Sequence, residues 1–178
     1  INLPATVELN KVTATASNNA VMIATSAGAA NVTINDSDLT GLAVVNVAGA
    51  NAQVAINNTK ITNLDATSAE NYGAISIFKT AENTKVTVKG GEIVLGDDSV
   101  AASNGAEGAN VTFEGTVGAE KVQTVVAYIG DAGYTSLQSA INGAKAGQTV
   151  TLIRDVTAKD IVVIDKAITL DGNGKKLT

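Results

Sequence analysis

The residues of this chain with the clearest chemical potential are acidic side chains in two short, oxygen-rich stretches. These stretches are Asn35-Asp36-Ser37-Asp38-Leu39-Thr40-Gly41 and Asp171-Gly172-Asn173-Gly174. Carboxylate, amide and hydroxyl oxygens are the ligands that Ca²⁺ prefers, but the ion needs about six to eight of them. Neither stretch has a full ligand series with a distal Glu, and Asp and Asn are also ordinary turn residues. We therefore expect solvated corners here, with no metal and no cofactor bound.

The remaining side chains give little support for catalysis. The 178 residues include no His and no Cys, so the chain has neither an imidazole nor a thiolate. A glycosidase needs two carboxyl groups on opposite sides of one bond. The acids are instead dispersed: Asp97 and Asp98 are adjacent, and Arg154, the single arginine, is followed by Asp155. We expect a surface ion pair at Arg154, no catalytic residues and no enzymatic activity.

Charge and aromatic content restrict the partners. A net charge of −5 and a pI of about 4.6 oppose binding to nucleic acid or to anionic membranes, because such binding needs clustered Lys or Arg. No apolar run approaches the roughly 20 residues of a membrane-spanning helix, so no membrane insertion is expected. Aromatic platforms for a glycan are scarce. Tyr72, beside Glu70 and Asn71 in a polar insertion, is the best candidate for contact with a ligand.

A recurrent tripeptide indicates the elements that carry these side chains. A β-branched residue is followed by Thr or Ala and then usually by an apolar residue, which is the alternation of a short strand with one inward face. The tripeptides begin at Val12, Val32, Val54, Val86, Val111, Val150 and Ile168. The offsets between the first five are 20 (32 − 12), 22 (54 − 32), 32 (86 − 54) and 25 (111 − 86). We expect two inward ladders, at Val32, Val54, Val86 and Val111 and at Ile34, Ile56, Val88 and Phe113.

The spacing within each period indicates the fold. A small or apolar residue lies nine positions before four of the valines (32 − 23, 54 − 45, 86 − 77 and 111 − 102), at Ile23, Val45, Ile77 and Ala102. Gly, Asn and Asp corners, which tolerate αL backbone, separate the short strands. A period of roughly 22 residues that holds about three strands is typical of a β-helix. The sequence predicts an all-β chain: a right-handed parallel β-helix (solenoid) with one short amphipathic capping helix.

The pattern changes after Phe113. Residues 122–129 read as a strand, and residues 134–144 read as a helix with an apolar face and Thr135 or Ser136 as its N-cap. We therefore expect β-helix rungs over residues 1–117 and a connecting strand and turn over residues 118–133. Residues 134–178 should form the cap helix and two starting rungs.

Three segments in this region carry a resemblance to a known family. Residues 134–141, 144–150 and 164–175 read YTSLQSAI, AKAGQTV and IDKAITLDGNGK. Together they resemble the N-terminal cap of pectate-lyase-like right-handed β-helices, a family of lyases, hydrolases and many bacterial surface proteins. The resemblance covers roughly residues 127–178 and implies that the helix shields the apolar end of a first rung. In this chain the motif lies at the C-terminal end.

This position of the cap motif predicts assembly. An uncapped β-helix exposes apolar side chains and unpaired backbone groups that template further strands. We expect residues 127–178 to complete the N-terminal end of a neighbouring copy, and so on into a filament. When residue 1 of one copy follows residue 178 of another, the offset from Ile168 to Val12 is (178 − 168) + 12 = 22, which equals the offset 54 − 32 within the chain. The residues expected at this interface are Leu3, Val7, Leu9, Val12, Leu137, Ile141, Val150, Leu152, Ile168, Leu170 and Leu177.

Two other arrangements give the same stacking. The chain is one permuted period of a covalent tandem array in the first, and in the second its C-terminal segment folds back onto its own rungs.

The function expected from these features is structural. We expect a subunit of a bacterial extracellular fibre or surface stalk whose main partner is another copy of itself. An adhesin module that binds host or microbial glycans or proteins is the alternative, and a polysaccharide lyase or hydrolase is less favoured. The expected location is extracellular, at the bacterial cell surface.

Overall fold

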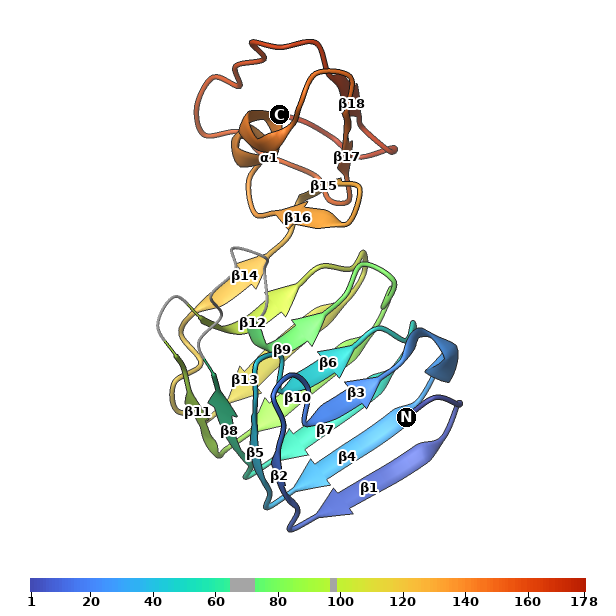
Figure 1. The fold of residues 1–178 in the computed structure, drawn as a ribbon, viewed down its shortest axis with the longest axis vertical. Helices are drawn as coiled ribbons and strands as arrows, with labels where there is room; N and C mark the ends of the chain where they lie inside the picture. Colours follow the sequence, from blue (N-terminus) through green and yellow to red (C-terminus); the bar gives the residue numbers. More distant parts are fainter. Residues whose placement is uncertain (65–72, 97–98) are drawn as a thin grey trace. The chain divides into compact units, whose positions relative to one another are not determined.

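The computed structural model describes residues 1–64, 73–96 and 99–178 (Figure 1). The chain divides into two compact units, Ile1–Gln123 and Thr124–Thr178, which are called the N-terminal unit and the C-terminal unit below.

The N-terminal unit is built from three parallel sheets whose strands follow one another in rotation along the chain (Figure 1). Sheet A has the order β1-β4-β7-β10-β13, with bounds Thr6–Asn10, Asn31–Asn35, Gln53–Asn57, Lys85–Lys89 and Asn110–Glu114. Sheet B has the order β11-β8-β5-β2, with bounds Glu92–Val94, Lys60–Asn63, Asp38–Gly41 and Thr13–Thr15. Sheet C has the order β14-β12-β9-β6-β3, with bounds Val122–Thr124, Val100–Asn104, Gly73–Ile77, Val45–Val47 and Val21–Ile23.

One strand from each sheet makes a turn, or rung, and successive rungs pair in parallel register. A short 3-10 helix, Thr25–Ala27, lies in the first rung between β3 and β4. The fold is a parallel β-helix, as the repeat predicts. The two inward ladders predicted for sheet A are confirmed, because Val32, Val54, Val86 and Val111 occupy one row of pairs and Ile34, Ile56, Val88 and Phe113 occupy the next.

The phase of the first rung differs from the prediction. Val7 pairs with Val32, and Leu9 pairs with Ile34, so the first tripeptide of sheet A begins at Val7 and not at Val12. Val12-Thr13-Ala14 belongs instead to the corner and strand of sheet B, where Ala14 pairs with Leu39. The first offset within sheet A is therefore 32 − 7 rather than 32 − 12. Both segments have the same alternation of apolar and polar residues, and this alternation does not distinguish one sheet of the helix from another.

The constant nine-residue spacing does not mark one row of sheet C, contrary to the prediction. In sheet C, Val21 pairs with Val45 and Val45 with Ile75, while Ile23 pairs with Val47. The residues that share this spacing therefore belong to two neighbouring rows of the same sheet. A slip of two residues leaves every side chain on its own face, since strand side chains alternate with a period of two. All of these rows are inward, so the error does not affect the predicted core.

The core of the N-terminal unit is a narrow column of stacked aliphatic side chains. Ile34, Ile56 and Val88 have no solvent exposure, and Val54 is 3% exposed. Val7 and Leu9 at one end, and Val111 and Phe113 at the other, are only partly buried. Burial therefore falls at both terminal rungs, as expected where a strand has a neighbour on one side only.

The C-terminal unit combines one helix with a four-stranded sheet of order β16-β15-β17-β18. The strands are β15 Ala127–Ile129, β16 Ala132–Tyr134, β17 Thr149–Leu152 and β18 Thr169–Asp171, and the helix is α1 Leu137–Gly143. β15 pairs antiparallel with β16 and β17, whereas β17 and β18 pair in parallel. The predicted continuous strand over residues 122–129 is two strands, β14 and β15.

The helix begins after one of the two predicted N-cap residues, Thr135 and Ser136. The Ser136 hydroxyl accepts a hydrogen bond from the Ser139 backbone N–H at 3.1 Å, so Ser136 is the N-cap. Leu137, Ala140 and Ile141 are buried against Ala127, Val150 and Leu152 in one core cluster. The helix therefore packs on this short sheet, and the shared apolar core holds the unit together.

The starting rungs of the C-terminal unit have a different register from the one predicted. Val150 pairs with Leu170, and Thr149 pairs with Thr169, so the second rung begins at Leu170 rather than at Ile168. With Val7 and Leu170 as the first rung positions, the offset becomes (178 − 170) + 7 = 15, so the predicted agreement with 22 is lost. This offset would constrain a covalent junction between residues 178 and 1, whereas separate copies have no such connection. The agreement between Ile168 and Val12 is therefore a coincidence of two misplaced phases.

Candidate functional site

The acidic side chains at the corners serve the turns that contain them. Asp36 has φ of 48°, and its Oδ1 accepts a hydrogen bond from Asn58 Nδ2 at 2.9 Å. Asp171 Oδ1 accepts from the Asn173 backbone N–H at 2.9 Å. Among the described residues, no group of three or more His, Cys, Asp or Glu side chains could hold a metal ion. Asp97, Asp98 and Tyr72 lie outside the described residues, so ligand contact at Tyr72 stays a prediction.

Arg154 and Tyr128 belong to the C-terminal unit. Arg154 Nε donates to the Val125 carbonyl oxygen at 2.9 Å, while the neighbouring Asp155 Oδ1 accepts from the Lys176 backbone N–H at 2.9 Å. Burial raises the pKa of Tyr128 to about 12, with Arg154 acting in the opposite direction and Asp131 adding to the rise. Tyr128 is therefore neutral at physiological pH, and the bonds of Arg154 and Asp155 tie together segments of this unit.

A column of left-handed residues fixes the corner that follows each strand of sheet A. Its members lie four positions after the first inward residue of their rung and have φ between 46° and 63°. They are Lys11, Asp36, Asn58, Gly90 and Gly115. In the C-terminal unit Gly174, four positions after Leu170, has φ of 71°. Asn173, at position three of this rung, is also left-handed with φ of 45°, so the corner resembles those of sheet A at position four and differs from them at position three.

An asparagine ladder runs along the end of sheet A, one position before this corner. Asn35 Nδ2 donates to Asn10 Oδ1 at 2.8 Å, and Asn57 Nδ2 donates to Asn35 Oδ1 at 2.8 Å. In both bonds the later rung donates to the earlier one. Such bonds join successive turns and satisfy amide groups at the edge of the sheet.

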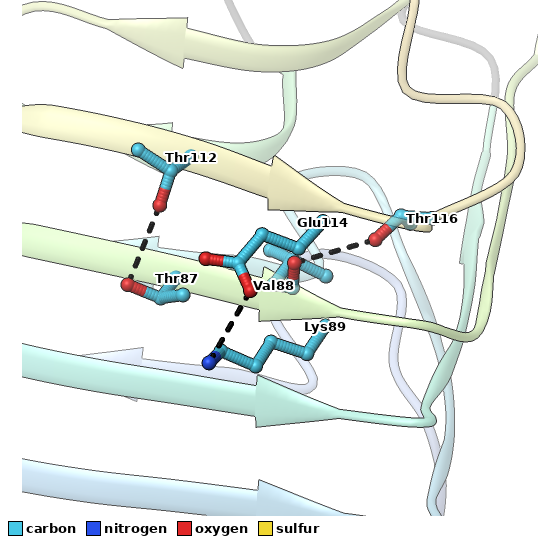
Figure 2. Close-up of polar contacts among 6 residues, drawn as sticks. All are labelled: Thr87, Val88, Lys89, Thr112, Glu114 and Thr116. Carbon is cyan, nitrogen blue, oxygen red and sulfur yellow. Dashed lines mark hydrogen bonds and ion pairs between the residues drawn. The ribbon is translucent and has the colours of Figure 1, made fainter.

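The same row continues with charged side chains in the next two rungs. Lys89 pairs with Asn57 on one side and with Glu114 on the other, and the Lys89 Nζ to Glu114 Oε2 distance is 3.2 Å (Figure 2). Beside this ion pair, the hydroxyl groups of Thr112 and Thr87 lie 3.4 Å apart. Both charged side chains are more than half exposed, so the pair adds little to stability. These rungs therefore hold ordinary structural contacts.

Among the described strands, the first rung of the N-terminal unit has a neighbour on one side only. β1 pairs with β4 alone among the described strands, and β1 and β2 end their sheets. Ile1 extends sheet C beyond β3, because its N-terminal amine donates to the Met22 carbonyl at 2.8 Å and its own carbonyl accepts from the Ala24 N–H at 2.9 Å. We call the surface formed by Ile1, β1 and β2 the N-terminal edge.

The residues predicted for assembly at this edge have different positions. Val7 and Leu9 point inward on β1 and are partly buried. Val12 is also partly buried, and its backbone N–H donates to Ser37 Oγ at 3.1 Å. Leu3 is 72% exposed before β1.

Among the described strands, the last rung of the C-terminal unit also has a neighbour on one side only. β18 ends its sheet, and an isolated parallel bridge joins Val156 to Leu177, which is 44% exposed. The β-branched run 161–164 lies between these rungs, and in it Ile161 is 88% and Val163 54% exposed. We call the surface formed by β18, Leu177 and Val163 the C-terminal edge. It gathers exposed aliphatic side chains of the kind that mark an interaction surface.

The other residues predicted for assembly in this unit lie mostly inside it. Leu137, Ile141, Val150 and Leu152 are at most 3% exposed and form the core beneath α1. Ile168 and Leu170 are partly buried against this core. The first four therefore hold the unit together, whereas Leu170 and Leu177 lie at its edge.

Sequence reasoning missed several residues of the two edges. Ile1, Asn10 and Val163 were not predicted to lie at an edge, and Asn173 was considered only as part of an oxygen-rich corner. The β-branched run Ile161-Val162-Val163-Ile164 could have indicated an edge segment. It was missed because the recurrent tripeptide has a central Thr or Ala, and this run has neither. The asparagines carry a spacing signal, since Asn10, Asn35 and Asn57 all lie three positions after a first inward residue.

Comparison of the chain with protein-family models, with curated proteins and with solved structures found no match. The resemblance to pectate-lyase-like caps therefore stays a prediction. Among the described residues, no helix has the length and apolar character needed to cross a membrane.

Proposed function

We propose that this chain is a structural subunit of a bacterial extracellular fibre or surface stalk, assembled head to tail by β-helix stacking. The observation that carries the proposal is that the N-terminal and C-terminal edges have opposite polarity and the same spacing of seven residues between successive inward positions (14 − 7 and 177 − 170). The N-terminal edge begins a β-helix that has no rung before it among the described residues, and the C-terminal edge ends a pair of parallel rungs with none after it among those residues.

Physical chemistry supports contact between such edges. An edge strand has a row of unpaired N–H and C=O groups that template a further strand. When a surface patch contacts a different patch on an identical molecule and the contact does not close into a ring, an open filament results. Stacking would also cover Val163, Ile161 and Leu177, whose exposure is unfavourable for an isolated subunit.

The composition of the chain fits this role. A filament subunit needs regular edges and a packed core, and it needs no cluster of reactive side chains. The bacterial and extracellular parts of the proposal derive from the resemblance described above.

A matched pair of substitutions tests the proposal. Val163→Asp places a charge on the C-terminal edge, whereas Val117→Asp places one at a similarly exposed site of the N-terminal unit, where Val117 is 65% exposed. We expect wild type and Val117→Asp to form filaments by light scattering and negative-stain microscopy, and Val163→Asp to stay monomeric. Loss of filaments in both variants, or in neither, would contradict the assignment of the edge.

A further inference from the structure

We infer the register of the junction, a step that rests on the proposed head-to-tail assembly. Leu170 of one copy pairs with Val7 of the next in sheet A, and Leu177 lies over Ala14 in sheet B. The partner is the N-terminal edge of a second copy of this chain.

Chain polarity selects which edges meet. In the N-terminal unit the rungs advance from β1 to β13, and in the C-terminal unit they advance from β17 to β18. All strands of one sheet run parallel, so a continuous helix requires the end of one unit to meet the beginning of another. β18 therefore stacks on β1. The other edge of sheet A, β13, already follows four rungs and would receive β18 only with the advance of the helix reversed.

The spacing within the rungs fixes sheets A and B together. The inward residue of sheet B lies seven positions after the first inward residue of sheet A in every complete rung of the N-terminal unit. The pairs are Val7 with Ala14, Val32 with Leu39, Val54 with Ile61 and Val86 with Ile93. Leu170 and Leu177 have the same spacing (177 − 170), and the left-handed corner falls at position four in both units, at Lys11 and Gly174. One placement therefore aligns two strands and the corner between them.

Sheet C does not fix the register by itself. In the row of Ile23, Val47, Ile77 and Asn104, the spacing to the next first inward residue of sheet A is seven in two rungs (54 − 47 and 111 − 104) and nine in the other two (32 − 23 and 86 − 77). Val163 lies seven positions before Leu170 and Ile161 lies nine positions before it, so this spacing allows either residue. The backbone bonds of Ile1 with Met22 and Ala24 place Ile1 beside Ile23, which pairs with Val47 in this row of sheet C. The Val163 backbone N–H donates to Gln138 Oε1 at 2.8 Å, and the Val163 carbonyl accepts from Gln138 Nε2 at 3.0 Å, so its backbone is already paired within the C-terminal unit. At sheet C the junction therefore covers exposed aliphatic side chains, and its register rests on sheets A and B.

The outer face of the junction includes one favourable and one unfavourable contact. Asn173 lies three positions after Leu170, as Asn10 does after Val7, so a continued ladder would have Asn10 Nδ2 donate to Asn173 Oδ1. In the C-terminal unit Asn173 Nδ2 donates instead to the Leu152 carbonyl at 3.1 Å. Asn173 has φ of 45°, and a ladder bond here requires its turn to change. Glu8 falls beside Asp171, and these like charges weaken the junction at low ionic strength.

Cross-linking tests the register, because the chain has no cysteine of its own. Thr169→Cys is mixed with Thr6→Cys, its partner in the inferred register, or with Glu8→Cys, which corresponds to a slip of two residues. All three positions are exposed. Paired residues of neighbouring strands have Cα atoms about 4.8 Å apart, within the range of a disulfide, whereas the slipped pair is separated by about 8 Å.

We expect oxidised Thr169→Cys and Thr6→Cys to give at least about tenfold more disulfide-linked dimer than the slipped pair. Filaments that cross-link equally or better through Glu8→Cys would overturn the register and leave the assembly intact. Absence of both filaments and cross-links would overturn the proposed function itself. A double variant, Thr6→Cys with Thr169→Cys, that gives an oxidised monomer at every concentration would show that the occupant is the chain's own C-terminal unit, which overturns the inference.

Discussion

Truncation of one inward valine tests the stacked core directly. Val54 lies in the middle of sheet A between Val32 and Val86 and is 3% exposed. Val54→Ala removes two buried methyl groups, which at about 0.8 kcal/mol each costs about 1.6 kcal/mol of transfer free energy. The closely packed rungs on both sides cannot collapse onto the space, so a cavity adds about 1 kcal/mol more. The free energy of unfolding should therefore fall by about 2.5 kcal/mol.

Val7→Ala is the matched control at the N-terminal edge. Val7 occupies the same row of sheet A, but it has a neighbouring rung on one side only and is partly exposed. Water can fill the space left by its methyl groups, so the expected cost in the monomer is about 1 kcal/mol. Guanidinium unfolding followed by circular dichroism gives both values at a concentration below that of assembly. Equal costs for the two variants, or a cost below about 0.5 kcal/mol for Val54→Ala, would refute the assignment of a closely packed inward ladder.

Two further predictions concern the corners and the C-terminal unit. Gly91→Ala should cost about 3–5 kcal/mol of unfolding free energy, because its φ is 73° and a Cβ would collide with the Thr59 carbonyl oxygen. Gly115→Ala, at φ of 63° with open space around it, should cost about 1–2 kcal/mol. Similar costs for the two variants in denaturant unfolding would contradict the inferred crowding at Gly91. The pKa of Tyr128 is raised from 10.0 to about 12 in the folded chain, so its contribution to stability is fully present below pH 10 and is lost as the pH rises towards 12. Between about pH 8 and pH 11.5, the free energy of unfolding of Tyr128→Phe should therefore fall by about 1–1.5 kcal/mol less than that of wild type, a figure that allows for the partial exposure of the phenol. An identical pH dependence of the unfolding midpoint in the two proteins would contradict the burial of the neutral side chain.

The fold could be predicted from the sequence because β-branched alternation repeats at a period that one turn of a β-helix requires. The inward positions Val32, Val54 and Val86 follow from this alternation alone. The phase of the first rung could not be read in the same way, since Val7-Glu8-Leu9 and Val12-Thr13-Ala14 both alternate and lie in different sheets. Alternation identifies the face of a strand and carries no information about its sheet.

The corners contain the information that was missed. Asp36, Asn58, Gly90 and Gly115 are residue types that accept a left-handed backbone, and their spacing equals that of the inward valines. The first member of this column is Lys11, a residue with no such preference, so the column is incomplete in the sequence. The prediction placed the second rung of the C-terminal unit at Ile168, two residues before Leu170. This error has the same origin as the one in sheet C, because residues two apart in a strand lie on the same face.

The mass of the unmodified protein in solution tests the central claim most directly. Static light scattering is measured over a range of concentrations at moderate salt. Head-to-tail stacking predicts a weight-average mass that rises continuously with concentration above the 17.8 kDa of one chain, without a plateau at a small closed oligomer. A mass that stays at 17.8 kDa at every concentration would contradict assembly between copies.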